Sequence, residues 1–165
     1  MTLRKLNHEA LPALRRPDPS EPPAGHGMHD YADCFEVSLS ADDDRTAEQV
    51  VRAGLAGAPS ALRRIIVVAH RHVLRFRLGP ASSPTHVLGW RIVTAEPETV
   101  QLEASGPLIR GVLVARRTPA GTATLDTFVY YRRPAARVIW ACASPVHRAI
   151  ATYLMGRAAT GISPR

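Results

Sequence analysis

The feature that most constrains the fold is a series of short apolar alternations near the middle of the chain. Apolar and polar residues alternate with a period of two in the runs 88–93, 100–104, 109–117 and 122–133. Turn sequences separate these runs: Glu96-Pro97, Ser105-Gly106-Pro107 and Thr118-Pro119-Ala120-Gly121. Parallel strands need crossovers of a dozen or more residues, whereas antiparallel strands are joined by short turns. The pattern therefore predicts an antiparallel meander.

The region before the meander predicts one strand followed by two short helices. Residues 31–39 alternate, with Phe35 among the side chains on one face and Cys34 among those on the other. Thr46 and Gln49 have the spacing of a capping box, which starts a helix that runs to about residue 55. We expect Ser60 to be the N-cap of a second helix.

Two further stretches complete the predicted sheet. Residues 73–78 are predicted to form a strand, although HVLRFRL is also compatible with an extension of the second helix. Residues 137–142 are predicted to form the last strand. The sequence thus predicts an α+β fold with about seven strands in one curved antiparallel sheet.

A long amphipathic helix is predicted to follow the last strand. Ser144-Pro145 supplies an N-cap and a proline at the first helical position. The apolar stripe of this helix is expected to consist of Val146, Ile150, Tyr153, Leu154 and Ala158. His147 would then lie in the first turn, where the positive end of the helix dipole favours a neutral imidazole.

Chain length and composition predict a single domain. The 165 residues suit one core, and we expect a domain over 29–160. Residues 1–28 are rich in proline without hydrophobic periodicity, which predicts a disordered or loosely attached arm, and 161–165 are expected to be a flexible tail. No apolar stretch approaches the roughly 20 residues of a membrane span, and no signal-peptide core is present, so a cytoplasmic location is expected.

The positive charges of the chain are concentrated in its second part. Residues 50–165 contain sixteen arginines and four acidic residues. These arginines are spread over many predicted elements, and none belongs to a helix-turn-helix or to a stripe interleaved with aromatic residues. A solvated outer face is the better explanation, so no specific nucleic-acid partner is expected. The oligomeric state stays open.

Two sequence segments resemble those of a known family. DYADCFEVSL near the start and IWACASPVHRAIATYL near the end are similar to segments of a bacterial domain family of unknown function. That family is usually grouped with the START-like superfamily, also called SRPBCC or polyketide-cyclase-like. The resemblance implies a helix-grip fold, in which a curved sheet grips the C-terminal helix around a cavity that often holds an apolar molecule. It also implies neighbouring first and last strands, which would bring Cys34 near Cys142 as free thiols.

The function expected from these observations is non-covalent binding of an apolar or amphipathic small molecule between the sheet and the C-terminal helix. The side chains expected to line the cavity are Trp90, Phe128, Tyr130, Trp140, His147, Ile150 and Leu154. No cofactor is expected. A metal site is not expected either, because His70-Arg71-His72 has no neighbouring cysteine or carboxylate cluster to complete it.

Two other classes of function stay open at this point. The chain lacks a G-x-S-x-G motif, a P-loop and a dinucleotide fingerprint, and we lean against an enzyme. The alternative is a cyclase, dehydratase or hydrolase that uses His147 and Asp126 as acid and base. Asp126 would enter the cavity, paired with an arginine such as Arg110 or Arg116, if the face of Phe128 pointed inward. It would be solvated, as we favour, if Leu125 and Val129 pointed inward. A third class is a cytosolic interaction module without a ligand.

Overall fold

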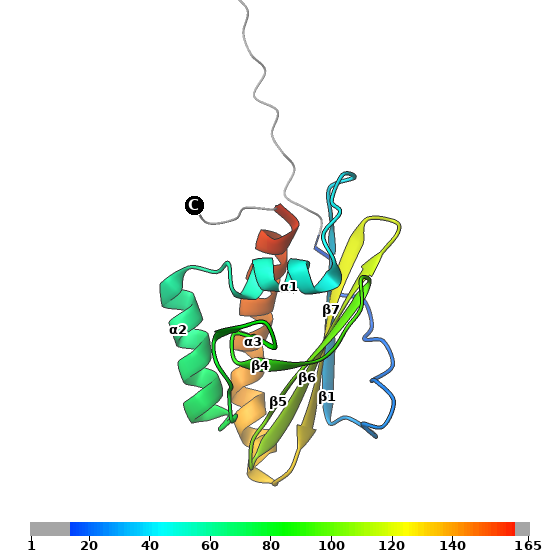
Figure 1. Ribbon diagram of the computed structural model, residues 1–165. Helices are drawn as coiled ribbons and strands as arrows, with labels where there is room; N and C mark the ends of the chain where they lie inside the picture. Colours follow the sequence, from blue (N-terminus) through cyan, green and yellow to red (C-terminus); the bar gives the residue numbers. More distant parts are fainter. Residues whose placement is uncertain (1–13, 161–165) are drawn as a thin grey trace, which may run out of the picture.

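A computed structural model of the protein describes residues 14–160 (Figure 1). Its elements confirm the α+β class. They are, in chain order, β1 (Tyr31–Ser38), α1 (Ala47–Leu55), α2 (Ser60–Val68), a π-helical turn η1 (Ala69–Val73), β2 (Ser82–Ser83), β3 (His86–Val87), β4 (Trp90–Ala95), β5 (Thr99–Ser105), β6 (Ile109–Thr118), β7 (Thr122–Tyr131) and α3 (Ala135–Thr160).

The sheet is an antiparallel meander, as the alternation predicts. The strand order is β1-β7-β6-β5-β4-β3-β2. The strand β1 is therefore an edge strand, and it pairs with β7, the last strand of the meander. The prediction of about seven strands includes two segments that are not strands and omits two short ones that are. Residues 73–78 and 137–142 form no strand, and β2 and β3 are two-residue strands of a short hairpin that the sequence pattern did not indicate.

All three α-helices lie on one face of the sheet (Figure 1). The main core fills the space between them and the strands. On β1 the alternation is as predicted, since Phe35, Val37 and Leu39 belong to this core. On β7 the core side chains are Leu125 and Val129, which is the orientation that the sequence favours.

The helix α1 begins as predicted. The Thr46 hydroxyl accepts a hydrogen bond from the Gln49 amide at 3.3 Å, and the Thr46 amide donates to Gln49 Oε1 at 2.7 Å. These two bonds form the capping box. The helix α2 differs, because Pro59 occupies the N-cap and Ser60 is already the first helical residue, so the prediction for Ser60 is wrong.

The segment after α2 continues as helix rather than as a strand. The π-helical turn η1 carries the helix to Val73, so only the first two residues of HVLRFRL follow the alternative of a helix extension. From Leu74 to Pro80 the backbone is irregular, and Leu74 and Phe76 are buried in the main core. The apolar side chains of this stretch therefore enter the core without belonging to a strand.

The helix α3 begins at Ala135, so the predicted last strand and the predicted helix start are both wrong. Residues 137–142 are helical, and Ser144 and Pro145 lie inside the helix. A proline in a helix interior removes one backbone hydrogen bond. The buried residues of the helix continue on both sides of that position: Ala136, Trp140, Ser144, Ala151, Leu154, Met155 and Ala158. Packing of this continuous stripe against the sheet compensates for the proline.

The opposite face of the sheet is covered by residues 14–30 (Figure 1). The backbone of Arg15 pairs with that of Glu36 on the free edge of β1, through bonds of 2.8 and 2.9 Å. Farther along, Ser20 and His26 hydrogen-bond to side chains of β7 and β5. The residues 1–13 of the predicted arm and the predicted tail 161–165 lie outside the described residues.

Candidate functional site

The seven side chains expected to line one cavity lie in separate parts of the molecule. Trp90 and Trp140 belong to the main core between the sheet and the helices, and His147 lies beside Trp140. Leu154 and Ile150 pack in a smaller cluster with α2. Phe128 and Tyr130 lie on the opposite face of the sheet.

The space between the sheet and α3 is filled by side chains. Phe35, Trp140 and Ala151 are among the buried core residues there. Two hollows can be described within residues 14–160, and neither lies in this space. One is an apolar groove between α2 and α3, and the other is a basic hollow at one end of the sheet.

A small polar cluster lies beneath α3 at its contact with β1. The Tyr31 hydroxyl donates a hydrogen bond of 2.5 Å to Oδ2 of Asp33, and Nε2 of His147 lies 3.3 Å from the same oxygen. The rings of Trp140 and His147 are 5.3 Å apart. The indole Nε1 of Trp140 is buried without a hydrogen-bond partner among residues 14–160. None of these residues lines either hollow.

The position of His147 corrects two predictions. Because α3 starts at Ala135, His147 lies in the middle of a long helix and not in a first turn. Its carboxylate partner is Asp33, whereas Asp126 points to the other face of the sheet. The predicted acid–base pair of His147 and Asp126 therefore does not form. The alternation of residues 31–39 places Asp33 on the same face as Phe35, but it does not indicate the pairing of Asp33 with a helix residue.

The environment of Asp33 shifts two pKa values. Burial alone would raise the pKa of the Asp33 carboxyl, but the hydrogen bond and charge of His147, together with the bond from Tyr31, outweigh it and lower that pKa. The pKa of the Tyr31 hydroxyl is raised, mainly by burial and then by its hydrogen bond to Asp33. The cluster thus keeps a carboxylate ionised inside a largely apolar interior.

A second histidine, His70, which the sequence suggests only as a metal ligand, is partly exposed and packs against two core residues. The indole Nε1 of Trp90 donates to Nδ1 of His70 at 3.3 Å, and Phe76 packs against both rings. Burial, and secondarily the charge of His147, lower the pKa of His70 to about 4. His70 is therefore a neutral acceptor for the tryptophan.

Asp126 is fully buried, although Leu125 and Val129 point toward the helices as the sequence favours. Its carboxylate is ion-paired with Arg116, and it accepts hydrogen bonds from the amide and hydroxyl of Ser20 at 3.2 and 3.0 Å. The expectation of a solvated Asp126 is wrong because the segment that contains Ser20 covers this face of the sheet. Arg116 is one of the two partners that the sequence suggested for a buried Asp126.

The two cysteines are free thiols on different sides of the sheet. Cys34 is buried and lies opposite Asp126 in the β1–β7 register. Cys142 is exposed on α3. Burial, followed by a hydrogen bond to Asp126, raises the pKa of the Cys34 thiol. The expectation that the two thiols lie close together is wrong, because 137–142 is part of the helix that covers the other face.

The apolar groove lies on the outer side of α3. Its volume is about 480 Å³, and it is lined by Leu62 of α2 and by Pro145, Val146, Ala149, Ile150 and Tyr153 of α3. Val146 is 59% exposed and Tyr153 is 44% exposed. These residues were expected to face the sheet. They face α2 instead, because the longer helix buries a different stripe.

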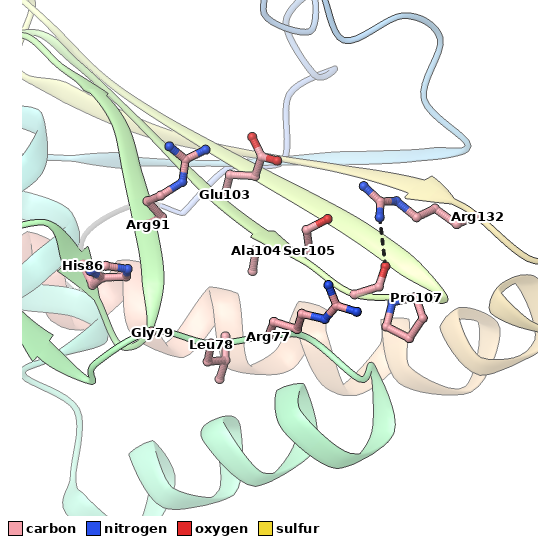
Figure 2. A pocket seen from close by; sticks show the side chains of 12 residues that line it. Arg77, Leu78, Gly79, His86, Arg91, Glu103, Ala104, Ser105, Pro107 and Arg132 are labelled. Atoms are coloured by element: carbon pink, nitrogen blue, oxygen red, sulfur yellow. Dashed lines mark hydrogen bonds between the residues drawn. The ribbon is translucent and has the colours of Figure 1, made fainter.

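The basic hollow lies where β4, β5 and the turn after β5 meet the irregular segment after η1 (Figure 2). Its volume is about 390 Å³. Arginine side chains enter it from three parts of the chain, namely Arg77, Arg91 and Arg132. The prediction of a solvated outer face for the arginines does not include this convergence, because the three residues lie far apart in sequence.

Comparisons with known proteins leave the family of this chain open. No protein-family model matches the chain, and a search of curated proteins finds no significant match. Within residues 14–160, no helix is both long and apolar enough to cross a membrane, and no three side chains of the metal-ligating types come together.

Proposed function

We propose that this protein binds an apolar or amphipathic small molecule without changing it, in the groove between α2 and α3. The observation that carries the proposal is the groove itself, whose walls are apolar side chains from both helices. Its volume of about 480 Å³ is in the range of small-molecule sites, roughly 300–1,000 Å³. Ile150, one of the side chains expected to contact a ligand, is part of its wall.

The exposure of the groove gives a physical reason for binding. Val146 and Tyr153 present apolar surface to water, and a ligand that covers them gains about 25 cal/mol for each Å² removed from water. The resemblance to START-like proteins supports the same class of function. That resemblance implies a site on the sheet side of the helix, whereas the proposal places the ligand on the side of α2.

One end of the groove suits the polar end of an amphipathic ligand. The guanidinium of Arg157 lies 5.9 Å from the centre of the Tyr153 ring. Its Nη2 donates a hydrogen bond of 3.4 Å to the carbonyl of Gly57. An anionic head group near Tyr153 would lie close to this positive charge, while its alkyl chain lies along Val146 and Ile150.

A matched pair of substitutions tests this proposal. Ala149→Trp fills the groove, whereas Ala141→Trp places the same side chain on an exposed position of α3 outside it. With decanoic acid as the probe, calorimetry is expected to show binding to the wild type and to A141W. Binding to A149W is expected to be at least about tenfold weaker, since overfilled sites lose their ligand contacts. Equal binding by both variants would overturn the proposal.

The second candidate is an interaction module, which the exposed residues around the groove favour. Ile65 of α2 is 59% exposed, as is Val146 of α3, so apolar surface on these helices is not confined to the groove walls. If the groove is a protein interface, A149W changes the association state measured by sedimentation while decanoic acid does not bind. The two candidates therefore differ in both measurements.

A further inference from the structure

The basic hollow at the end of the sheet has the features of a ligand site that is separate from the groove. Three arginine side chains line it, together with the ring of His86 and one carboxylate, Glu103. In Figure 2, Arg77 and Arg132 enter the same space at one end, and Arg91 and Glu103 lie toward the other. These residues come from different segments, so the fold assembles the hollow.

The charge in the hollow is not neutralised by the protein. Glu103 is already bound through both oxygens by Arg110, at 2.8 and 3.1 Å. Arg77, Arg91 and Arg132 have no carboxylate within 4.0 Å among residues 14–160. Arg132 donates one hydrogen bond of 3.2 Å, to the carbonyl of Gly106. Guanidinium donors therefore remain available to an anion.

The backbone around the hollow is unusually tight. A side chain at Gly106 would meet the carbonyl oxygen of Arg75 at 2.2 Å, so only glycine allows this approach. Within the described residues, Arg75 and Leu88 are the two non-glycine residues with positive φ, at 60° and 50°. Such strained conformations cluster at functional sites. Both residues lie next to the lining, since Leu88 precedes Gly89 and the carbonyl of Arg75 lies against Gly106.

We infer that this hollow binds a small organic phosphate monoester, with the phosphate group held by Arg77 and Arg132. Guanidinium groups bind phosphate through paired, charge-assisted hydrogen bonds. A tetrahedral phosphate presents oxygens in several directions, which suits donors that enter from opposite sides. The hollow of about 390 Å³ is larger than one phosphate group. The organic part of the ligand lies toward Leu78 and His86.

The inference does not depend on the proposed function of the groove, because no residue lines both hollows. Phenyl phosphate is the probe, and calorimetry at constant ionic strength is the measurement. The wild type is expected to bind it more tightly than inorganic phosphate. Phenol, which lacks the phosphate, is expected not to bind.

Arginine variants locate the binding. Arg77→Gln and Arg132→Gln are each expected to weaken binding of phenyl phosphate by about tenfold or more, the usual effect of losing a hydrogen bond between charged groups. Arg133→Gln is the matched control, since this exposed arginine neighbours Arg132 but does not line the hollow. It is expected to change the affinity by less than about twofold.

Two results would overturn the inference. One is an equal loss of affinity in R133Q and R132Q, which indicates general attraction of an anion to a basic protein. The other is unchanged affinity in R77Q. Arg77 makes no side-chain hydrogen bond to residues 14–160, so R77Q is expected to keep the fold. Its affinity for phenyl phosphate therefore tests the inference even if R132Q loses stability.

Discussion

Asp33 and Asp126 lie on neighbouring strands of the sheet, yet the protein stabilises their charges in different ways. Asp33 points toward the helices and binds groups that can gain or lose protons, His147 and Tyr31. Asp126 points toward the covering segment and binds the permanently charged Arg116, with Ser20 above it. The difference teaches that the helix face is sensitive to acid, whereas the carboxylate of Asp126 depends on a fixed ion pair.

The largest effect is expected when the ion pair of the outer face is broken. Arg116→Ala leaves the carboxylate of Asp126, which is 0% exposed, without a charged partner. Removing one partner of a buried pair typically costs about 3–5 kcal/mol. Urea unfolding measures this loss. Arg110→Ala, which breaks a pair with the less buried carboxylate of Glu103, is the control and should cost about 1 kcal/mol. Equal losses in the two variants would contradict the contrast.

The next largest effect is expected from acid, which lowers the stability of the helix face through His70. The pKa of His70 is lowered from 6.5 to about 4, so the unfolded chain takes up the proton first. Its contribution to stability is complete above pH 6.5 and is lost as the pH falls to about 4, by about 3 kcal/mol. His70→Gln should remove this loss, as seen in urea unfolding across that range. The exposed neighbour His72→Gln should keep it.

A smaller effect is expected from Asp33→Asn, which keeps the shape but removes the charge between Tyr31 and His147. Losing charged hydrogen bonds of this kind costs about 1–3 kcal/mol at neutral pH. Because the pKa of Asp33 is lowered, its contribution is complete above the ordinary value of 3.8 and is lost as the pH falls below it. The difference between wild type and D33N in urea unfolding should therefore shrink in strong acid. A constant difference would contradict the assignment.

The smallest effect is expected from Ser20→Ala, which removes the hydroxyl that donates to Asp126 at 3.0 Å. The backbone hydrogen bond of Ser20 remains, so the cost should be about 0.5–1.5 kcal/mol. Hydrogen exchange of β7 should become faster, because the covering segment is held less tightly. Ser40→Ala, which removes a hydrogen bond to the exposed Asp42, is the control and should leave β7 exchange unchanged.

Local patterns predicted the parts of the fold whose interactions are local. The meander followed from alternation and turns, and the Thr46–Gln49 capping box satisfies backbone groups within one helical turn. Ser144-Pro145 also has the local pattern of a helix start, but the helix α3 begins earlier, at Ala135. The burial of Trp140 and Ala136 on the sheet stabilises helix before the proline, and no local rule contains that contact.

The candidate sites were predicted less well, because they depend on contacts between distant segments. His147 was singled out, but its partner Asp33 is 114 positions away in sequence. The solvated state expected for Asp126 failed because Ser20, which is 106 positions away, lies over it. The basic hollow depends in the same way on Arg77 and Arg132, which belong to different segments.

The sequence by itself determined the α+β class, the meander and the alternation of β1, because alternation and turn chemistry act between near neighbours. Only the tertiary structure decided which face of α3 is buried, where the two hollows lie and how each buried aspartate is neutralised. These outcomes depend on which surfaces meet when the helices and the segment 14–30 close over the sheet. The free energy of that packing outweighs local preferences such as those of Pro145.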